Sequence, residues 1–143
     1  MPSSPKYIDA DSLAALLRDP TLQIGKDFVV VDVRGDDFAN GNIRGAVNVP
    51  SHEFLEDPAA YVEKFKDVPK VVFHCALSQV RGPKCAQRYA QALEDGVAKA
   101  AIDGSLPSEV LILRGGFENW QSGPTRRDLI ESYNEEFWKN PYF

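Results

Sequence analysis

The chain has 143 residues, of which 43% are hydrophobic and 26% charged, and this is the size and composition of one globular domain. Its formal net charge of −5 excludes the basic surface that general nucleic-acid binding requires. Its apolar runs are too short to cross a bilayer, and its N-terminus lacks the pattern of a secretory signal. We therefore expect a single domain over residues 1–143 in the cytoplasm or nucleus, without nucleic-acid or membrane partners.

The N-terminal part of the chain contains three periodic segments that turn-forming residues separate. Residues 6–8 are predicted to be extended. Asp9 or Asp11 is expected to cap a helix that carries leucines at helical spacing and ends near Arg18. The run 28–33 is apolar and mostly β-branched, which is typical of a strand buried on both faces.

Strands and helices continue to alternate along the rest of the chain. Further short strands are predicted at 46–49, 70–74 and 110–113. Asp57-Pro58 is typical of a capped helix start, and this helix should run to Phe65. Another helix is expected from about Pro83 to Leu93. Such alternation predicts an α/β domain with parallel strands, whose ligands gather beyond the carboxyl ends of the strands.

The last part of the chain has apolar residues at near-helical spacing, namely Leu129, Ile130, Tyr133, Phe137 and Trp138. This pattern predicts a final helix over about 126–139 that packs on a core of about residues 6–122. The alternative is a dimer or partner surface formed by Trp138, Tyr142 and Phe143. We expect a monomer or a weak homodimer.

The loop after the predicted strand 70–74 carries the candidate chemistry. His74-Cys75 ends the strand, and Arg81 stands where the next helix begins. Five residues lie between Cys75 and Arg81: Ala76, Leu77, Ser78, Gln79 and Val80. The amides of a tight loop and of a helix N-terminus direct positive potential into one concavity, which suits a tetrahedral oxyanion. The same field stabilises a thiolate, so Cys75 is the candidate nucleophile, ionised near neutral pH.

Four further residues are expected to support this loop. Arg81 can hold two oxyanion oxygens with its planar guanidinium. His74 should orient the loop through ring hydrogen bonds, and Ser78 should donate to the Cys75 thiolate or stabilise it as a leaving group. Asp32 is interpreted as scaffold that needs a cationic partner, either Arg34 or Arg44. The alternative for Cys75 itself is a small buried residue without a catalytic role.

Three blocks of the chain resemble a known family. His74 to Arg81 resembles the cysteine-phosphatase signature His-Cys-x5-Arg. Val31 to Arg34 followed by Gly41 to Pro50, together with Leu113 to Trp120, resembles the first and last blocks of the rhodanese fold. The chain is therefore similar to the rhodanese-fold group that includes the M-phase inducer phosphatases and the eukaryotic arsenate reductases. This resemblance implies a three-layer domain with a central, mostly parallel, five-stranded sheet flanked by helices.

The resemblance also implies a function. Cys75 would act in a phosphatase of the tyrosine or dual-specificity type, in an arsenate reductase, or in both, with phosphate, arsenate or a phosphoprotein as substrate. No tightly bound cofactor and no metal are expected. Arsenate reduction would need an external thiol, glutathione or glutaredoxin. Sulfurtransferases of this fold usually have one residue fewer between the cysteine and the arginine. A thiosulfate sulfurtransferase with a Cys75 persulfide is therefore an alternative, as is a binding module without catalysis.

The resemblance leaves open the role of Cys85 and the identity of the general acid. Cys85 is a candidate resolving thiol, although packing in the core is the interpretation we favour. The loop contains no carboxylate and the chain contains no Trp-Pro-Asp segment. Asp36, Asp37 and Glu53 are therefore positional candidates for the general acid, with solvated surface residues as the alternative. His52 is interpreted as a loop histidine.

Overall fold

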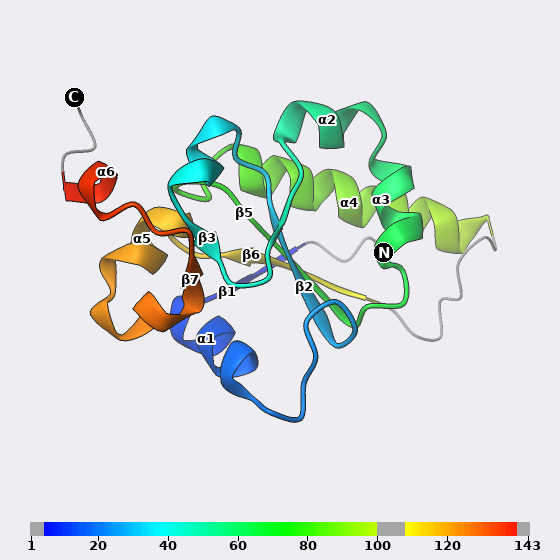
Figure 1. The fold of residues 1–143 in the computed structure, drawn as a ribbon. Coiled ribbons are helices and arrows are strands. Elements are labelled where there is room, and N and C mark those ends of the chain that lie inside the picture. Colours follow the sequence, from blue (N-terminus) through cyan, green and yellow to red (C-terminus); the bar gives the residue numbers. More distant parts are fainter. Residues whose placement is uncertain (1–4, 100–107, 140–143) are drawn as a thin grey trace.

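The computed structural model describes residues 5–99 and 108–139, and Figure 1 shows their arrangement. The strands are β1 (Lys6–Ile8), β2 (Phe28–Asp32), β3 (Asn42–Ile43), β4 (Val47–Asn48), β5 (Lys70–His74), β6 (Glu109–Leu113) and β7 (Ile130–Glu131). The helices are α1 (Ala10–Arg18), α2 (Ser51–Glu56), α3 (Pro58–Phe65), α4 (Arg81–Ala98), α5 (Gly116–Ser122) and α6 (Glu135–Lys139), with the 3₁₀ helices η1 (Asp36–Asn40) and η2 (Pro124–Leu129).

Five strands form one sheet in the order β1-β6-β5-β2-β4, and all neighbours pair in parallel. This arrangement confirms the predicted α/β fold with a five-stranded sheet. The register places Asp32, at the end of β2, beside His74, at the end of β5. The loop that follows β5 therefore lies between the ends of β2 and β6, at the edge where parallel sheets bind ligands. No helix among the described residues is both long and apolar enough to span a membrane.

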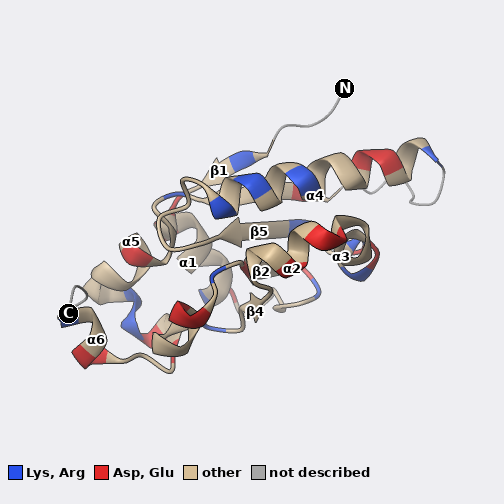
Figure 2. Cartoon of the chain, turned by 90° about the horizontal axis from the view of Figure 1, so that it is seen from above, with Lys and Arg blue, Asp and Glu red and all other residues tan. Residues whose placement is uncertain are grey.

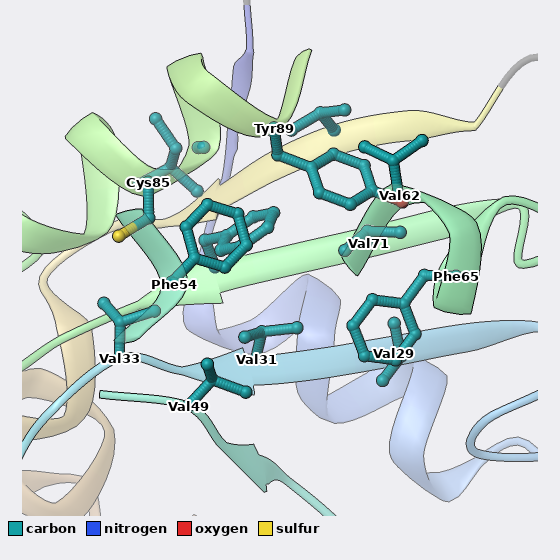
Figure 3. Packing of buried hydrophobic residues seen from close by; sticks show 14 of the residues in the cluster. Val29, Val31, Val33, Val49, Phe54, Val62, Phe65, Val71, Cys85 and Tyr89 are labelled. Carbon is teal, nitrogen blue, oxygen red and sulfur yellow. The ribbon is translucent and has the colours of Figure 1, made fainter. Parts of the chain in front are cut away.

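Helices cover both faces of the sheet (Figure 1). Alternate strand residues point to opposite faces, so Val29 and Val31 join one core whereas Val30 joins the other. The first core contains side chains of α2, α3 and α4, and Figure 3 shows Phe54, Phe65 and other members packed over β2 and β5. The second core contains side chains of α1 and α5. Burying one such aromatic side chain contributes about 1.5–3 kcal/mol.

Several predicted boundaries agree with the structure. The extended segment 6–8 is strand β1, and Asp9 caps α1, since its carboxylate accepts from the Ser12 amide at 2.8 Å. Strand β5 has the predicted bounds, and α3 begins after the Asp57 cap as expected. Strands β2 and β4 end earlier than predicted, at Asp32 and Asn48.

Helices α2 and α4 differ from the prediction, and α5 was not predicted. Helix α4 begins at Arg81 and extends to Ala98, so it is longer than predicted at both ends. Pro83 permits the earlier start, because N–H groups in the first turn of a helix have no acceptor within the helix and a proline there removes no hydrogen bond. His52 lies exposed on α2 and not in a loop, so that interpretation was wrong. Helix α2 has one fully buried residue, Phe54, whose ring packs against Phe73 at 5.4 Å. A six-residue helix with one such contact gives little periodicity to read in a sequence.

The predicted final helix over 126–139 was also wrong, because this segment divides into η2, β7 and α6. Ile130 pairs with Ile43 in an antiparallel ribbon, and Ser132 has a φ of 56°, which ends any helix there. Trp138 then returns to the domain, where its ring lies 5.6 Å from that of Phe117. Leu129, Ile130 and Trp138 thus reach the core from three separate segments. Tyr142 and Phe143 of the alternative surface lie outside the described residues.

Candidate active site

The loop from Cys75 to Val80 is attached to α5 through its backbone. The amide of Phe117 donates to the carbonyl of Cys75 at 3.0 Å, and the amide of Glu118 donates to the carbonyl of Ala76 at 2.9 Å. In a trans peptide the carbonyl and the following N–H point in opposite directions. The amides of Ala76 and Leu77 therefore point away from α5 and stay available to a ligand.

Two glycines allow this close packing. Gly116 has a φ of +61°, and a Cβ at this position would come within 2.6 Å of the Cys75 carbonyl oxygen. Gly82, on the other side, would place a Cβ 3.2 Å from the Cys75 amide nitrogen. The backbones of α5 and α4 thus enclose the first residues of the loop. Side chains at these positions would push the loop away from its present course.

The loop offers several hydrogen-bond donors without a protein acceptor. Within the described part of the chain, the backbone amides of residues 76–80 donate no hydrogen bond. The Ser78 hydroxyl is buried and also lacks a partner there, and Ser78 has a φ of 56°. The expected hydrogen bond from Ser78 to the Cys75 sulfur is therefore not formed, and the Gly82 amide donates to that sulfur instead. A buried donor without a partner, such as the Ser78 hydroxyl, is rare in proteins unless a ligand or a water takes it. These groups suit the oxygens of a tetrahedral anion.

Cys75 lies at the base of this loop with its side chain buried. The Gly82 amide, in the first turn of α4, donates to the Cys75 Sγ at 3.3 Å. The N-terminus of an 18-residue helix carries a positive partial charge, which favours a thiolate and an anionic ligand. Figure 2 shows that lysines and arginines occupy the first half of α4, whereas acidic residues lie further along. The positive potential is therefore local in an acidic protein.

Arg81 begins α4, and its side chain is 40% exposed. Its Nη2 lies 3.9 Å from the Asp37 Oδ2 in η1. Among the three positional candidates for the general acid, Asp37 is thus the one beside the arginine. Asp36 and Glu53 are exposed, and neither forms an ion pair within residues 5–99 and 108–139.

Asp32 and Arg34 form a fully buried ion pair below the loop. The guanidinium donates to both carboxylate oxygens, with the Nη2 to Oδ2 distance at 2.7 Å. Burial would raise the pKa of Asp32, but its interactions with His74 and Arg34 outweigh this effect, so the pKa lies below its usual value. Arg44 instead donates to the Leu17 carbonyl. Of the two expected partners, Arg34 is the one that pairs.

His74 lies between this pair and the nucleophile. Its Nδ1 lies 3.0 Å from the Cys75 carbonyl oxygen, and its Nε2 lies 3.6 Å from the Asp32 Oδ2. Burial lowers the pKa of His74 despite the opposing charge of Asp32, so the ring is neutral at neutral pH. A neutral ring with its proton on Nδ1 donates to the Cys75 carbonyl. This is the kind of ring hydrogen bond that the sequence predicted.

Cys85 packs in the first core, where Figure 3 shows it on α4 near Phe54. Burial, together with the nearby Cys75, raises the pKa of the Cys85 thiol to about 12. A thiol that is so seldom ionised attacks poorly, since the thiolate is the nucleophile. This environment favours the packing interpretation over the resolving role. In the described ranges no group of three metal-ligating side chains occurs.

The contribution of α5 is the part of the site that sequence reasoning did not identify. The block Leu113 to Trp120 was noted for its resemblance, without a role for Gly116, Phe117 or Glu118. The available signal was the pair Gly115-Gly116, one residue after a buried strand, because paired glycines there indicate a close backbone approach.

Comparisons with known proteins bear on the family and the fold of the chain. A family model described as "Rhodanese-like domain" matches residues 9–123. "Dual specificity phosphatase Cdc25" of Arabidopsis thaliana is 34% identical over 123 residues, which cover 85% of this chain and 77% of the relative. "Arsenate reductase 2.2" of Oryza sativa subsp. japonica is 34% identical over 116 residues, with coverages of 80% and 81%. The crystal structure of Saccharomyces cerevisiae Ygr203w, described as a homolog of single-domain rhodanese and the Cdc25 phosphatase catalytic domain, has a TM-score of 0.73 at 27% identity, covering 96% and 97%.

Proposed function

The chain belongs to the rhodanese-like domain family, among its Cdc25-like phosphatases and arsenate reductases, and from this premise we propose that Cys75 attacks tetrahedral oxyanions. The observation that carries the proposal is the loop itself. The Cys75 sulfur lies at the base of five consecutive amides that have no acceptor among the described residues, and Arg81 closes the loop. Such preorganised donors stabilise negative charge that develops on the oxygens of the transition state.

For a phosphate monoester, the reaction has two steps. The Cys75 thiolate forms a bond to phosphorus while the bond to the ester oxygen breaks, and the leaving oxygen takes a proton. Water then attacks the cysteinyl-phosphate, so that the S–P bond breaks and the thiolate is restored. The loop amides and Arg81 hold the three remaining phosphoryl oxygens through both steps.

For arsenate, the first step is the same, and a hydroxyl group leaves arsenic as water. An external thiolate, glutathione or that of glutaredoxin, then attacks the Cys75 sulfur. The S–As electron pair stays on arsenic, which leaves as arsenite, and a second thiol reduces the mixed disulfide. The burial of Cys85 favours an external reductant over an internal one.

The deciding experiment gives the purified protein three substrates in parallel: an aryl phosphate, arsenate with glutathione, and thiosulfate with cyanide. We predict turnover of the first two, and inhibition of arsenate reduction by inorganic phosphate, because both anions occupy one loop. Cys75→Ser should lower turnover by at least ~10⁴-fold, because a hydroxyl does not ionise near neutral pH. Binding of inorganic phosphate, measured by calorimetry, should persist in this variant.

Cys85→Ser is the matched control, because it changes the other thiol of the chain in the same way. It should retain both activities. Loss of arsenate reduction alone in Cys85→Ser would instead identify Cys85 as the resolving thiol. Efficient transfer of sulfur from thiosulfate to cyanide, without phosphatase or arsenate turnover, would refute the proposal in favour of a sulfurtransferase.

A further inference from the structure

The proposed reaction needs a proton for the leaving oxygen, and the loop between Cys75 and Arg81 contains no acidic side chain. We propose that Asp37 is the residue that supplies this proton. The inference rests on the proposed function, since it assigns a role within the same reaction. It selects one residue from three acidic positions that the sequence alone does not distinguish.

The direction of the reaction explains why the position of Asp37 suits a proton donor. A thiolate at the base of the loop attacks in line, so the leaving oxygen points away from Cys75 and out through the mouth. Arg81 binds oxygens beside that path, and the Asp37 Oδ2 lies 3.9 Å from its Nη2. A carboxyl group at this place is within reach of an oxygen that leaves a phosphoryl group held by Arg81.

The turn that carries Asp37 is held at both ends. The buried Arg34 donates to the Asp37 carbonyl at 3.4 Å and to the Gly41 carbonyl at 2.7 Å. Beyond Asp37 in the turn, the Asn40 carbonyl accepts from the Trp138 indole at 3.0 Å and from the Asn134 amide at 3.1 Å. A side chain on such a supported element keeps its place relative to the loop, as a proton donor requires.

The ion pair with Arg81 places the Asp37 side chain beside the bound substrate. A phosphate ester in the loop engages Arg81 and brings its own negative charge close to this side chain, an arrangement that in general favours the neutral form of a carboxyl group. The side chain is 34% exposed, so it can take this proton from water.

Asp37 loses one proton and regains one in each turnover. As the P–O bond breaks, the carboxyl proton moves to the ester oxygen, which leaves as an alcohol or phenol. The resulting carboxylate then accepts a proton from the water that attacks the cysteinyl-phosphate. Asp37 is thereby protonated again when inorganic phosphate forms.

Dependence on the leaving group tests this role. Asp37→Asn should lower kcat/KM for phenyl phosphate by ~10²-fold or more, since general acid catalysis contributes that much. For dinitrophenyl phosphate the change should stay below about threefold, because this phenolate leaves without a proton. Asp36→Asn is the matched control, because it removes the same charge from the adjacent residue, and it should leave both values unchanged. Asp37→Glu should restore part of the phenyl phosphate activity.

A uniform loss on both substrates would overturn the inference and show that Asp37 only positions Arg81. Unchanged rates in Asp37→Asn would overturn it as well. Inhibition by inorganic phosphate should be retained in the variant, which verifies an intact loop, and circular dichroism verifies the fold. If the wild-type protein hydrolyses neither ester, the proposed phosphatase function fails and this inference fails with it. If the wild type hydrolyses both esters but Asp37→Asn does not distinguish between them, only the role of Asp37 is refuted and the phosphatase function is unaffected.

Discussion

Arg81 has a positive charge and a planar pair of donors, and a lysine at this position would share only the charge. The pair matches two oxygens of a tetrahedral anion, whereas an ammonium group acts as a single point charge. We predict that Arg81→Lys weakens inhibition by inorganic phosphate and lowers kcat/KM for an aryl phosphate by about 10²-fold, the cost of losing one well-placed donor.

Arg88→Lys provides the comparison for this prediction, because Arg88 is an exposed residue of the same helix. Its kinetics should match those of the wild type. Steady-state rates and phosphate inhibition constants of the two variants, measured side by side, check the prediction. Wild-type values in Arg81→Lys would remove the guanidinium from the site.

At the scale of single residues, the sequence predicted which residues form the site better than it predicted which of them pair with each other. The spacing of Cys75 and Arg81 between a strand and a helix placed them on one loop, and the structure has that loop. Asp32 had two candidate arginines, and only the folded chain shows that Arg34 pairs with it. Asp36 and Asp37 are neighbours in one turn, so their different surroundings depend on how η1 packs against Arg81.

Among the elements, the turn from β6 into α5 controls the loop most directly. Gly116 has a positive φ and lies against the carbonyls of Cys75 and Ala76. In Gly116→Ala the new Cβ must displace the loop, and the strained backbone costs about 1–3 kcal/mol of folding free energy. Since a misplacement of about 1 Å can cost up to ~10²-fold in rate, activity should fall by more than stability alone explains.

Gly35→Ala is the control for the steric part of this prediction, because a Cβ at Gly35 meets nothing within 4 Å. Urea unfolding and aryl phosphate kinetics of both variants provide the measurement. Equal activities in the two variants would show that α5 does not determine the course of the loop.

Elements buried between two layers were the ones the sequence predicted best. Strands β2 and β5 are short apolar runs, which is the pattern of parallel strands covered on both faces. The C-terminal segment was misread because its apolar residues have helical spacing although they act in separate elements. A long-range pairing, Ile130 with Ile43, overrides that local pattern.

For the molecule as a whole, the buried groups below the loop connect the site to the stability of the fold. Asp32, Arg34 and His74 are fully buried at the carboxyl end of the sheet. Removing one partner of a buried ion pair typically costs about 3–5 kcal/mol, since the other charge remains without compensation. These residues therefore support the loop and the fold together.

The same groups predict how stability depends on pH. The pKa of His74 lies below its ordinary value of 6.5 because burial disfavours the charged ring, although Asp32 opposes the effect. The unfolded chain therefore takes up this proton before the folded protein does, and the free energy of unfolding falls as the pH drops below 6.5. The pKa of Asp32 lies below its ordinary value of 3.8, so its stabilising effect is present above that pH. It is lost as the pH falls through the lower value of the folded state.

We therefore predict a plateau of stability near neutral pH and a decline that begins below about pH 6.5. While folded His74 stays neutral, each pH unit below that point costs about 1.4 kcal/mol, or up to about 2 kcal/mol at pH 5. Urea unfolding at about pH 7.5 and pH 5 measures this difference.

His74→Asn removes the titrating ring, so the unfolding free energy of this variant should change less between the two pH values, even if it is lower at both. His52→Gln changes the other histidine, which is exposed on α2, and should keep the wild-type difference. An undiminished difference in His74→Asn would mean that other groups cause the acid sensitivity, and the buried histidine would then have no part in it.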